Sequence, residues 1–447
     1  MNKIFLYAFV LAGLASCKGP SEEEKAQAAA RTPADTVTTA ATSVDLPAPY
    51  ATESVTKRSK VIDWPAGRTP VVPAGFTVTE YAGSFNSPRW LYVTPNGDVL
   101  VAESNTVPTN PKKKVAAALN LDPSRSLKPT SANRITLLRD TNQDGKPDLR
   151  ATFLTGLNQP LGMLVLGNYF YVANTDAVLR FAYQPGQTKI TGPGQKILDL
   201  PAGGYNNHWT RNLLAAPDGS KIYVSVGSGS NVGENGMDKE KRRANVLVIN
   251  PDGSGEQIYA AGLRNPVGMA WAPGTGTLWT AVNERDELGD ELVPDYLTSV
   301  RQGAFYGWPY AYFGQHEDPR RQGEAPELVR KTVVPDVALG PHTASLGLAF
   351  YDQKAFPAKY RNGAFIGQHG SWNRSTFSGY KVVFVPFHNG RPSGPMEDFA
   401  TGFIANEEGK QVYGRPVGLT VQPDGALLIA DDAGNKVWRV VAANSGK

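Results

Sequence analysis

Six segments of the chain repeat one pattern of apolar and polar positions. In each, a polar loop leads into an apolar strand, then a turn such as PNG, PDG or PGTG, and then a second apolar strand. The copies begin with NSPRWLYV at Asn86, NQPLGMLVL at Asn158, NHWTRNLLAA at Asn207, RNPVGMAW at Arg264, TASLGLAF at Thr343 and GRPVGLTV at Gly414. A unit of about four strands cannot bury its faces alone, so such units stack on their neighbours. Because radial stacking of these units makes a β-propeller, we predict an all-β fold, a six-bladed β-propeller.

Individual strands show as β-branched or aromatic runs between turns, for example DVLVAE at 98–103 and KIYVSVG at 221–227. The last apolar run, KVWRVVA at 436–442, is predicted to pair with an N-terminal strand near 76–81 and to close the ring. Helical periodicity is scarce. Residues 112–121 are expected to form a short helix or a disordered loop insertion, and residues 292–302 a helical turn.

The first 17 residues have the layout of a processing signal. Lys3 is followed by an apolar run from Ile4 to Leu14 and then by Ala-Ser-Cys17. This run is too short to span a bilayer. It resembles a bacterial lipoprotein signal in which Cys17 becomes the lipidated first residue, and the alternative is an ordinary secretory signal. Under either interpretation we expect a protein of the bacterial cell envelope, facing the periplasm or the cell surface, which touches the membrane through its lipid anchor only.

Composition defines the remaining organisation. Residues 18–60 are rich in Ala, Thr, Ser, Pro and Glu and hold few large apolar side chains, so we predict a flexible tether there. The propeller domain is expected to occupy residues 61–447, with its last strand ending near 442. Cys17 is the only cysteine, which excludes an internal disulfide. The net charge of +4 is small for 447 residues, and no basic stripe is interleaved with aromatic residues, so a nucleic-acid partner is not expected.

The loops that precede the repeats carry the candidate chemistry. His208 follows GGYNN and stands just before an apolar strand, which would place it at the mouth of the central channel as a base. The alternative is a loop histidine bonded to a neighbouring carbonyl. Arg264 and Arg415 occupy the corresponding places in later repeats, and Arg89 is near it in the first. Arginines that converge on the axis suit a ligand with several carboxylates. They could equally pair with aspartates and hold the ring together.

Two loops are rich in oxygen ligands, which calcium prefers. The first is NERDELGDE at 283–291, for which a solvated acidic loop is the alternative. The second, at 140–148, fits a DxNxDGxxD spacing with Asp140, Asn142, Asp144 and Asp148 as candidate ligands of a structural calcium ion. It lacks the glutamate that completes the corresponding helix-flanked loops, so a plain hairpin turn is the alternative. The chain has no phosphate-binding loop, CxxC pair or HExxH sequence.

From about residue 72 to 441 the repeats and loops resemble the glucose/sorbosone dehydrogenase family, whose members are six-bladed propellers that use pyrroloquinoline quinone (PQQ) and calcium to oxidise sugars. The strings NERDxLGDEL and GQHGSWNR resemble its sorbosone and pyranose dehydrogenase-like branch most specifically. The resemblance implies that His208 in GGYNNHWTRNL is the catalytic base. It implies that Arg264 and Asn265 in GLRNPVGMAW bind the quinone, and that the backbone carbonyls of Arg285 and Asp286 hold the catalytic calcium.

Two segments depart from the family pattern. YGRPVG resembles the last quinone-binding segment, which carries two arginines in several members, but here only Arg415 matches and Tyr413 stands at the other place. In GAFIGQHGSWNR the family often supplies a lysine to the quinone, and Gly370 falls at that place. Arg374 or His369 is the expected substitute.

The resemblance implies that His208 takes the proton of a sugar hydroxyl or an aldehyde hydrate while hydride passes to PQQ, with calcium as a Lewis acid. Because the chain has no CxxCH haem motif, the electron acceptor would be a separate cytochrome or quinone. Two other classes remain open. One is a calcium-dependent hydrolase of the lactonase type, and the other is a non-catalytic lipoprotein that binds carbohydrate or a protein partner.

Overall fold

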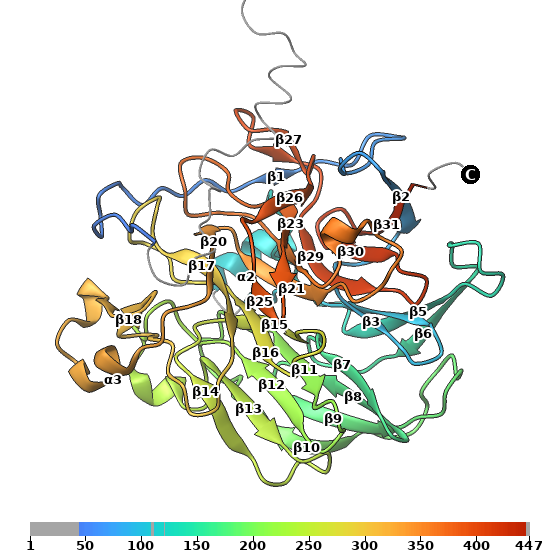
Figure 1. Ribbon diagram of the computed structural model, residues 1–447, viewed down its shortest axis with the longest axis horizontal. Helices are drawn as coiled ribbons and strands as arrows, with labels where there is room; N and C mark the ends of the chain where they lie inside the picture. Colours follow the sequence, from blue (N-terminus) through green and yellow to red (C-terminus); the bar gives the residue numbers. More distant parts are fainter. Residues whose placement is uncertain (1–43, 109–110, 120, 444–447) are drawn as a thin grey trace, which may run out of the picture.

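The computed structural model describes residues 44–108, 111–119 and 121–443, and within them the strands form six four-stranded sheets (Figure 1). Each sheet is antiparallel and is called a blade below. Blade 1 contains β3 (Pro88–Val93), β4 (Val99–Glu103), β5 (Arg134–Arg139) and β6 (Leu149–Leu154). Blade 2 contains β7 (Met163–Leu166), β8 (Tyr169–Ala173), β9 (Ala177–Ala182) and β10 (Gln195–Asp199). Blade 3 contains β11 (Arg211–Ala215), β12 (Ile222–Val226), β13 (Asn245–Ile249) and β14 (Gln257–Ala261).

Blade 4 contains β15 (Pro266–Trp271), β16 (Leu278–Val282), β17 (Pro294–Ser299) and β20 (Val337–Pro341). Blade 5 contains β21 (Ser345–Phe350), β22 (Ala364–Gln368), β23 (Lys381–Val385) and β26 (Glu397–Ala400). Blade 6 contains β29 (Pro416–Val421), β30 (Leu427–Asp431), β31 (Lys436–Ala442) and, from the N-terminal part of the chain, β2 (Phe76–Ala82). The all-β propeller expected from the repeats is therefore confirmed.

The first strands of the six repeats form the inner ring. β3, β7, β11, β15, β21 and β29 contact one another in this order, and β29 contacts β3 in turn. Blade 6 closes the ring through the pairing of β2 with β31, which lie side by side in Figure 1 although they come from opposite ends of the described chain. The sequence predicted this closure. It gives β31 a partner strand on each side, while β2 forms the outer edge of blade 6.

A glycine within the repeat lets neighbouring blades approach closely. A Cβ atom on Gly418 would lie 2.9 Å from Trp90 Cα, and one on Gly347 would lie 1.9 Å from the carbonyl oxygen of Val417. Gly162 and Gly268 meet the next inner strand in the same way. Any side chain at these places would push the inner strands apart. The glycine is thus required at these four contacts between neighbouring blades.

Shorter elements decorate the blades. They are β1 (Lys60–Val61), β27 (Ile404–Asn406) and β28 (Gln411–Val412) in one small sheet, the hairpins β18 (Ala311–Tyr312) with β19 (His316–Glu317) and β24 (Phe387–His388) with β25 (Arg391–Pro392), the helices α2 (Pro111–Ala118) and α3 (Pro326–Lys331), and the 3₁₀ turns η1 (Met237–Glu240), η2 (Pro319–Arg321) and η3 (Ala358–Tyr360). Helix α2 bears out the helical alternative for the insertion. No helix among the described residues is both long and apolar enough to cross a bilayer.

Residues 292–302 were predicted to form a helical turn, and this prediction is wrong. The segment contains β17, the third strand of blade 4, and its first five residues are buried. Leu292, Val293, Leu297 and Val300 have a spacing that suits one face of a helix. A strand buried on both faces does not alternate, so apolar spacing alone could not separate the two structures.

The expected tether also differs in its described part. The N–H of Tyr50 donates to the carbonyl of Leu288, and the N–H of Lys57 donates to the carbonyl of Trp372. Val44 and Leu46 pack against the apolar cluster of blade 4. The segment 44–60 therefore lies along the propeller, and ordered contacts begin before residue 61. Cys17 and residues 18–43 lie outside the described residues.

Candidate active site

A cavity of about 1000 Å³ opens where the loops before the inner strands meet. His208 precedes β11, Arg264 and Asn265 precede β15, His342 precedes β21, and Arg415 precedes β29, and all of them line this cavity. The insertion between β4 and β5 adds Thr106, Ser124, Ser126 and Leu127, and the N-terminal segment adds Arg58 and Ser59. The sequence prediction that loop residues of successive blades converge is thus confirmed for His208, Arg264 and Arg415.

His208 is held in one tautomer. Its Nδ1 atom lies 2.9 Å from the carbonyl oxygen of Ser228 and 2.9 Å from the hydroxyl of the same residue. A carbonyl oxygen can only accept, so Nδ1 carries the proton and donates it. The Ser228 hydroxyl in turn donates to the carbonyl of Ser230. Nε2 has no partner among the described residues, which leaves its lone pair available on a side chain that lines the cavity.

The electrostatic surroundings keep this imidazole neutral. Burial of the ring, followed by the positive charge of Arg264, lowers the pKa of His208 well below its ordinary value. A neutral imidazole with a free Nε2 lone pair is the form that accepts a proton. The interpretation of His208 as a loop histidine bonded to a neighbouring carbonyl therefore describes its Nδ1 atom, and a role as a base, which would rest on Nε2, stays a prediction.

Arg264 and Asn265 differ in how far the protein satisfies them. The Arg264 guanidinium donates to Asn231, through both its carbonyl and its side-chain oxygen, and to the carbonyls of Asn283 and Glu284. Its Nη2 atom also lies 3.3 Å from Asp286 Oδ2. The Asn265 side chain, by contrast, makes no hydrogen bond within the described chain, and its Oδ1 atom is fully buried. An unpaired amide at a cavity wall is a site for a polar ligand.

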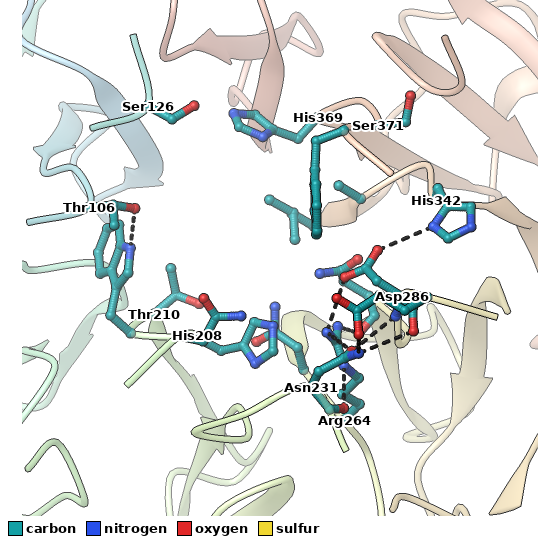
Figure 2. Close-up of a pocket in the computed structure, with 18 of the residues that line it drawn as sticks. Thr106, Ser126, His208, Thr210, Asn231, Arg264, Asp286, His342, His369 and Ser371 are labelled. Atoms are coloured by element: carbon teal, nitrogen blue, oxygen red, sulfur yellow. Dashed lines mark hydrogen bonds and ion pairs between the residues drawn. The ribbon is translucent and has the colours of Figure 1, made fainter. Parts of the chain in front are cut away.

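Asp286 stands between two cationic groups, as Figure 2 shows. Its carboxylate contacts Arg264 at 3.3 Å and His342 Nδ1 at 3.2 Å. Although burial alone would raise it, the pKa of Asp286 is lowered overall by the His342 hydrogen bond and the Arg264 charge. The Nε2 atom of His342 lies 2.8 Å from the carbonyl of Gly289, so both of its ring nitrogens face acceptors. Burial opposes the charge, but these contacts raise the pKa of His342 overall.

A second group of polar side chains lies across the cavity from His208, where Figure 2 shows His369 and Ser126. Arg415 donates to the carbonyls of His369 and Gly370 and to the hydroxyl of Ser126. His369 Nε2 lies 2.8 Å from Asp432, which also pairs with Arg89. Burial, followed by the charge of Arg415, lowers the pKa of His369 to about 3. This imidazole is therefore neutral at ordinary pH.

Three residues singled out in the sequence do not line the cavity. Arg374 is buried and binds the carbonyl of Asp290 and the carboxylate of Glu291. Of the two expected substitutes for the family lysine, only His369 reaches the cavity. The Arg285 side chain pairs with Glu284 and Asp318 inside the protein. Tyr413 is also turned away and stacks on Trp64 with ring centroids 5.1 Å apart.

The loop 140–148 satisfies its own oxygen atoms. Asp140 accepts from the N–H groups of Asp144 and Gly145, Asn142 accepts from the N–H of Asp144, and Asp148 accepts from Thr141. Nowhere in the described chain do three His, Cys, Asp or Glu side chains gather as a metal site. The loop joins β5 to β6, and the structural calcium site expected there stays a prediction.

Cationic side chains outnumber anionic ones around the cavity. The arginines that line it are Arg58, Arg89, Arg264, Arg320, Arg321 and Arg415, and the carboxylates are Glu234, Asp286 and Glu287. Six positive charges against three negative ones leave an excess of three before histidines are counted. A positive, partly buried cavity concentrates anionic ligands.

Asn231, Arg320 and His342 line the cavity but were not predicted from the sequence. Asn231 lies in a loop within blade 3, and Arg320 lies in η2 within the long connection between β17 and β20. Arg320 has no counterpart, because no other blade has so long a connection at this place, whereas Asn231 lies between the second and third strands of its blade, as Asp286 does in blade 4. His342 did carry a signal, because it stands three residues before β21, as His208 stands three residues before β11.

The sequence of the chain is similar to those of known proteins. A family model described as Glucose / Sorbosone dehydrogenase matches residues 170–371, and one described as TrAA12-like matches residues 315–443. An uncharacterized protein of Borreliella burgdorferi is 30% identical over 300 residues, which are 65% of this chain and 77% of that protein. Aldose sugar dehydrogenase YliI of Escherichia coli is 29% identical over 201 residues, 44% of this chain and 47% of that enzyme. The match thus spans about half the length of the E. coli relative.

Two solved structures share the fold. The calcium structure of the Trichoderma reesei carbohydrate-active enzyme of family AA12 has a TM-score of 0.66 at 18% identity, over 84% of this chain and 97% of that one. The holo form of the PQQ domain of pyranose dehydrogenase from Coprinopsis cinerea has a TM-score of 0.64 at 19% identity, over 85% and 100%. These structures show the fold, and the matches of sequence to the family model and to the relatives lead to one conclusion: the chain belongs to the glucose/sorbosone dehydrogenase family.

Proposed function

We propose that this protein is a PQQ-dependent dehydrogenase that oxidises a sugar or a sugar-derived aldehyde. The observation that carries the proposal is the pairing, in one cavity, of a neutral histidine whose Nε2 is free with an excess of arginine side chains. The histidine suits removal of a hydroxyl proton, and the arginines suit a quinone that bears carboxylates. The PQQ-containing relative from Coprinopsis cinerea supports the same choice of cofactor.

The residues of the cavity fit PQQ. The unpaired amide of Asn265 offers a hydrogen-bonding group that no protein atom uses. Arg264 and Arg415 line the cavity and supply positive charge for the carboxylates of the quinone, and Arg89 adds a further positive charge. Arg264 is held in place by the carbonyls around it, so its charge is already oriented before a ligand binds. Such preorganised charge costs little reorganisation on binding.

The predicted calcium site does not fit as well. Arg285, one of the two residues expected to offer a carbonyl, does not line the cavity. The carbonyl oxygen of the other, Asp286, accepts hydrogen bonds from Asn231 Nδ2 at 3.1 Å and from Arg320 Nη1 at 2.9 Å. Its lone pairs are therefore engaged by protein donors. We derive no step through a metal ion.

The chemical step that we propose uses the protein's own groups as follows. The free Nε2 of His208 takes the proton of the substrate hydroxyl. The carbon that bears this hydroxyl gives up its hydrogen as a hydride, and a carbonyl group forms. PQQ, when bound, supplies the two-electron acceptor for that hydride. Burial and then the charge of Arg264 lower the pKa of the base and keep it neutral, and Arg264 orients the anionic cofactor.

We also propose that the electrons pass onward to a separate cytochrome or quinone, and that the protein acts in the cell envelope as a lipid-anchored enzyme. Both proposals rest on the sequence, namely the absence of a CxxCH haem motif and the signal that ends at Cys17.

The lactonase-type hydrolase and the non-catalytic binding protein are the competing functions. A channel hydrolase of that type holds calcium with inward Glu, Asn and Asp side chains and needs no arginine cluster, whereas six arginines and three carboxylates line this cavity. The test is to incubate the purified protein with PQQ and a panel of aldoses and aldehydes and to follow dye reduction, with and without calcium. Sugar-dependent dye reduction supports the dehydrogenase. Lactone hydrolysis without PQQ supports the hydrolase, and neither activity supports the binding protein.

A further inference from the structure

The Asp286 carbonyl faces two side chains that are themselves locked in position. Asn231 accepts from Arg264 Nη2 at 2.8 Å and from the Asp286 N–H at 3.0 Å through its Oδ1 atom, which turns its Nδ2 group toward the Asp286 carbonyl. An amide fixed at its oxygen has little freedom to move its nitrogen away. The hydrogen bond from Nδ2 to the carbonyl is therefore built into the loop.

Arg320 is fixed just as firmly. Its Nε and Nη2 atoms donate to the two carboxylate oxygens of Asp318, each at 2.9 Å. Asp318 is completely buried and also pairs with Arg285. This fork leaves Nη1 to donate to the Asp286 carbonyl at 2.9 Å. A bidentate guanidinium–carboxylate pair sets both position and orientation, so a full positive charge is aimed at the oxygen that calcium would need.

The charges around this point are unfavourable for a divalent cation. Arg264 contacts the Asp286 carboxylate, and Arg320 contacts its carbonyl, so two guanidinium groups flank one acidic residue. Calcium takes six to eight oxygen ligands that carry negative or unopposed partial charge. Arg320 lines the cavity, and its guanidinium is already a cation with directed donors.

From this arrangement we propose that the cavity binds its anionic quinone without a divalent cation, and that the Arg320 guanidinium supplies the positive charge that calcium supplies in the family that the sequence resembles. This inference rests on the proposed PQQ-dependent function. It assigns to Arg320 a cofactor-binding role, because the guanidinium lies at the cavity wall beside Asp286 and Asn231.

The test measures the binding of PQQ to the metal-free full chain, once in EGTA and once in calcium. Binding is monitored by isothermal titration calorimetry or by the quenching of tryptophan fluorescence. We expect the wild type to bind PQQ with the same affinity in both. Arg320→Gln should bind PQQ roughly tenfold to a hundredfold more weakly in EGTA, because a charge-assisted contact is lost. Arg330→Gln is the matched control, since Arg330 lies exposed on α3 and pairs only with Glu327 in the described structure. It should bind as the wild type does.

A measurement on the wild type does not depend on the folding of any variant. Equilibrium dialysis of the PQQ-loaded protein against calcium should find no stoichiometric calcium. Wild type that binds PQQ only in calcium, or that retains one calcium ion with the quinone, overturns the inference and leaves the dehydrogenase proposal standing. Wild-type affinity in a folded Arg320→Gln, checked by its melting temperature, also overturns it. Wild type that binds no PQQ in either buffer refutes the proposed function instead.

Discussion

Gly370 lies so close to Tyr380 that no side chain fits between them. A Cβ atom on Gly370 would stand 2.4 Å from Cδ2 of the Tyr380 ring, and the φ angle of Gly370 is +100°. Its carbonyl accepts a hydrogen bond from Arg415 at 2.9 Å. The lysine that family members often carry at this place is therefore sterically excluded here. Arg415 brings a positive charge to the same part of the cavity wall from the next blade.

Replacing Gly370 with alanine should destabilise the protein through two separate effects. The positive φ costs a residue with a Cβ atom about 1 kcal/mol or more, and the clash with the ring adds about 1–3 kcal/mol. Gly97→Ala is the matched control, because its φ is +90° but nothing lies within 4 Å of its added Cβ. Denaturant unfolding should show the larger loss for Gly370→Ala. Equal losses in the two variants would mean that Tyr380 moves freely out of the way.

The pH dependence of catalysis should reflect the lowered pKa of His208. Burial and the Arg264 charge disfavour the imidazolium, so the base stays neutral below the ordinary histidine pKa of about 6.5. We expect kcat/KM to remain near its maximum as the pH falls through 6.5 and to drop only at lower pH. The measurement is a pH profile of kcat/KM with saturating PQQ.

A substitution at Asp286 should shift this pH profile in a direction that can be predicted. The negative charge of Asp286 raises the pKa of His208, although by less than burial and Arg264 lower it. Asp286→Asn removes that charge and should move the acid limb of the profile to still lower pH. An acid limb at or above 6.5 in the wild type, or a shift toward higher pH in the variant, contradicts the assignment of His208 as the titrating base.

Asn265→Ala should separate cofactor binding from stability. The Asn265 side chain makes no hydrogen bond in the described protein, so removing it breaks no internal contact and relieves a buried polar atom. We expect the melting temperature to change little, while the affinity for PQQ falls about tenfold through loss of one hydrogen bond to the ligand. The readouts are thermal unfolding of the apoprotein and PQQ titration.

Asn212→Ala provides the opposite control. The Asn212 amide is buried and donates to the carbonyl of Val267 in the next blade at 2.8 Å. Its loss should lower stability by about 1–3 kcal/mol because that carbonyl is left unpaired. PQQ affinity should stay as in the wild type. A large loss of stability in Asn265→Ala with unchanged PQQ affinity would show that this amide has a structural role only.

Much of the fold was accessible from the sequence because the ring is built from a repeat. The apolar runs predicted the inner strands, and the terminal run at 436–442 predicted its partner near residue 76. The error at β17 has a physical cause. A strand that is buried on both faces shows no alternation of apolar and polar residues, and Leu297 and Val300 are spaced as on one face of a helix.

The residues of the site also divide into those that the repeat pattern predicts and those that it does not. His208, Arg264 and Arg415 stand at equivalent places in their repeats, so the repeat pattern alone predicts that they converge on one cavity. Arg320 comes from the long connection between β17 and β20, which has no counterpart in the other blades, and its convergence with Asn231 on Asp286 depends on tertiary packing. Arg374 shows the reverse limit. It lies only four positions after Gly370, yet its side chain points to Asp290 and Glu291, away from the cavity lining.

The most direct test of the central claim compares wild type with His208→Gln in a single turnover. Both proteins are loaded with PQQ without oxygen, mixed with an aldose that the wild type oxidises, and followed by the absorbance of the bound quinone. Because glutamine cannot take the proton, we expect equal PQQ binding but a rate of quinone reduction that is lower by roughly 10²–10⁴-fold in the variant. Reduction at the wild-type rate in His208→Gln would contradict the account.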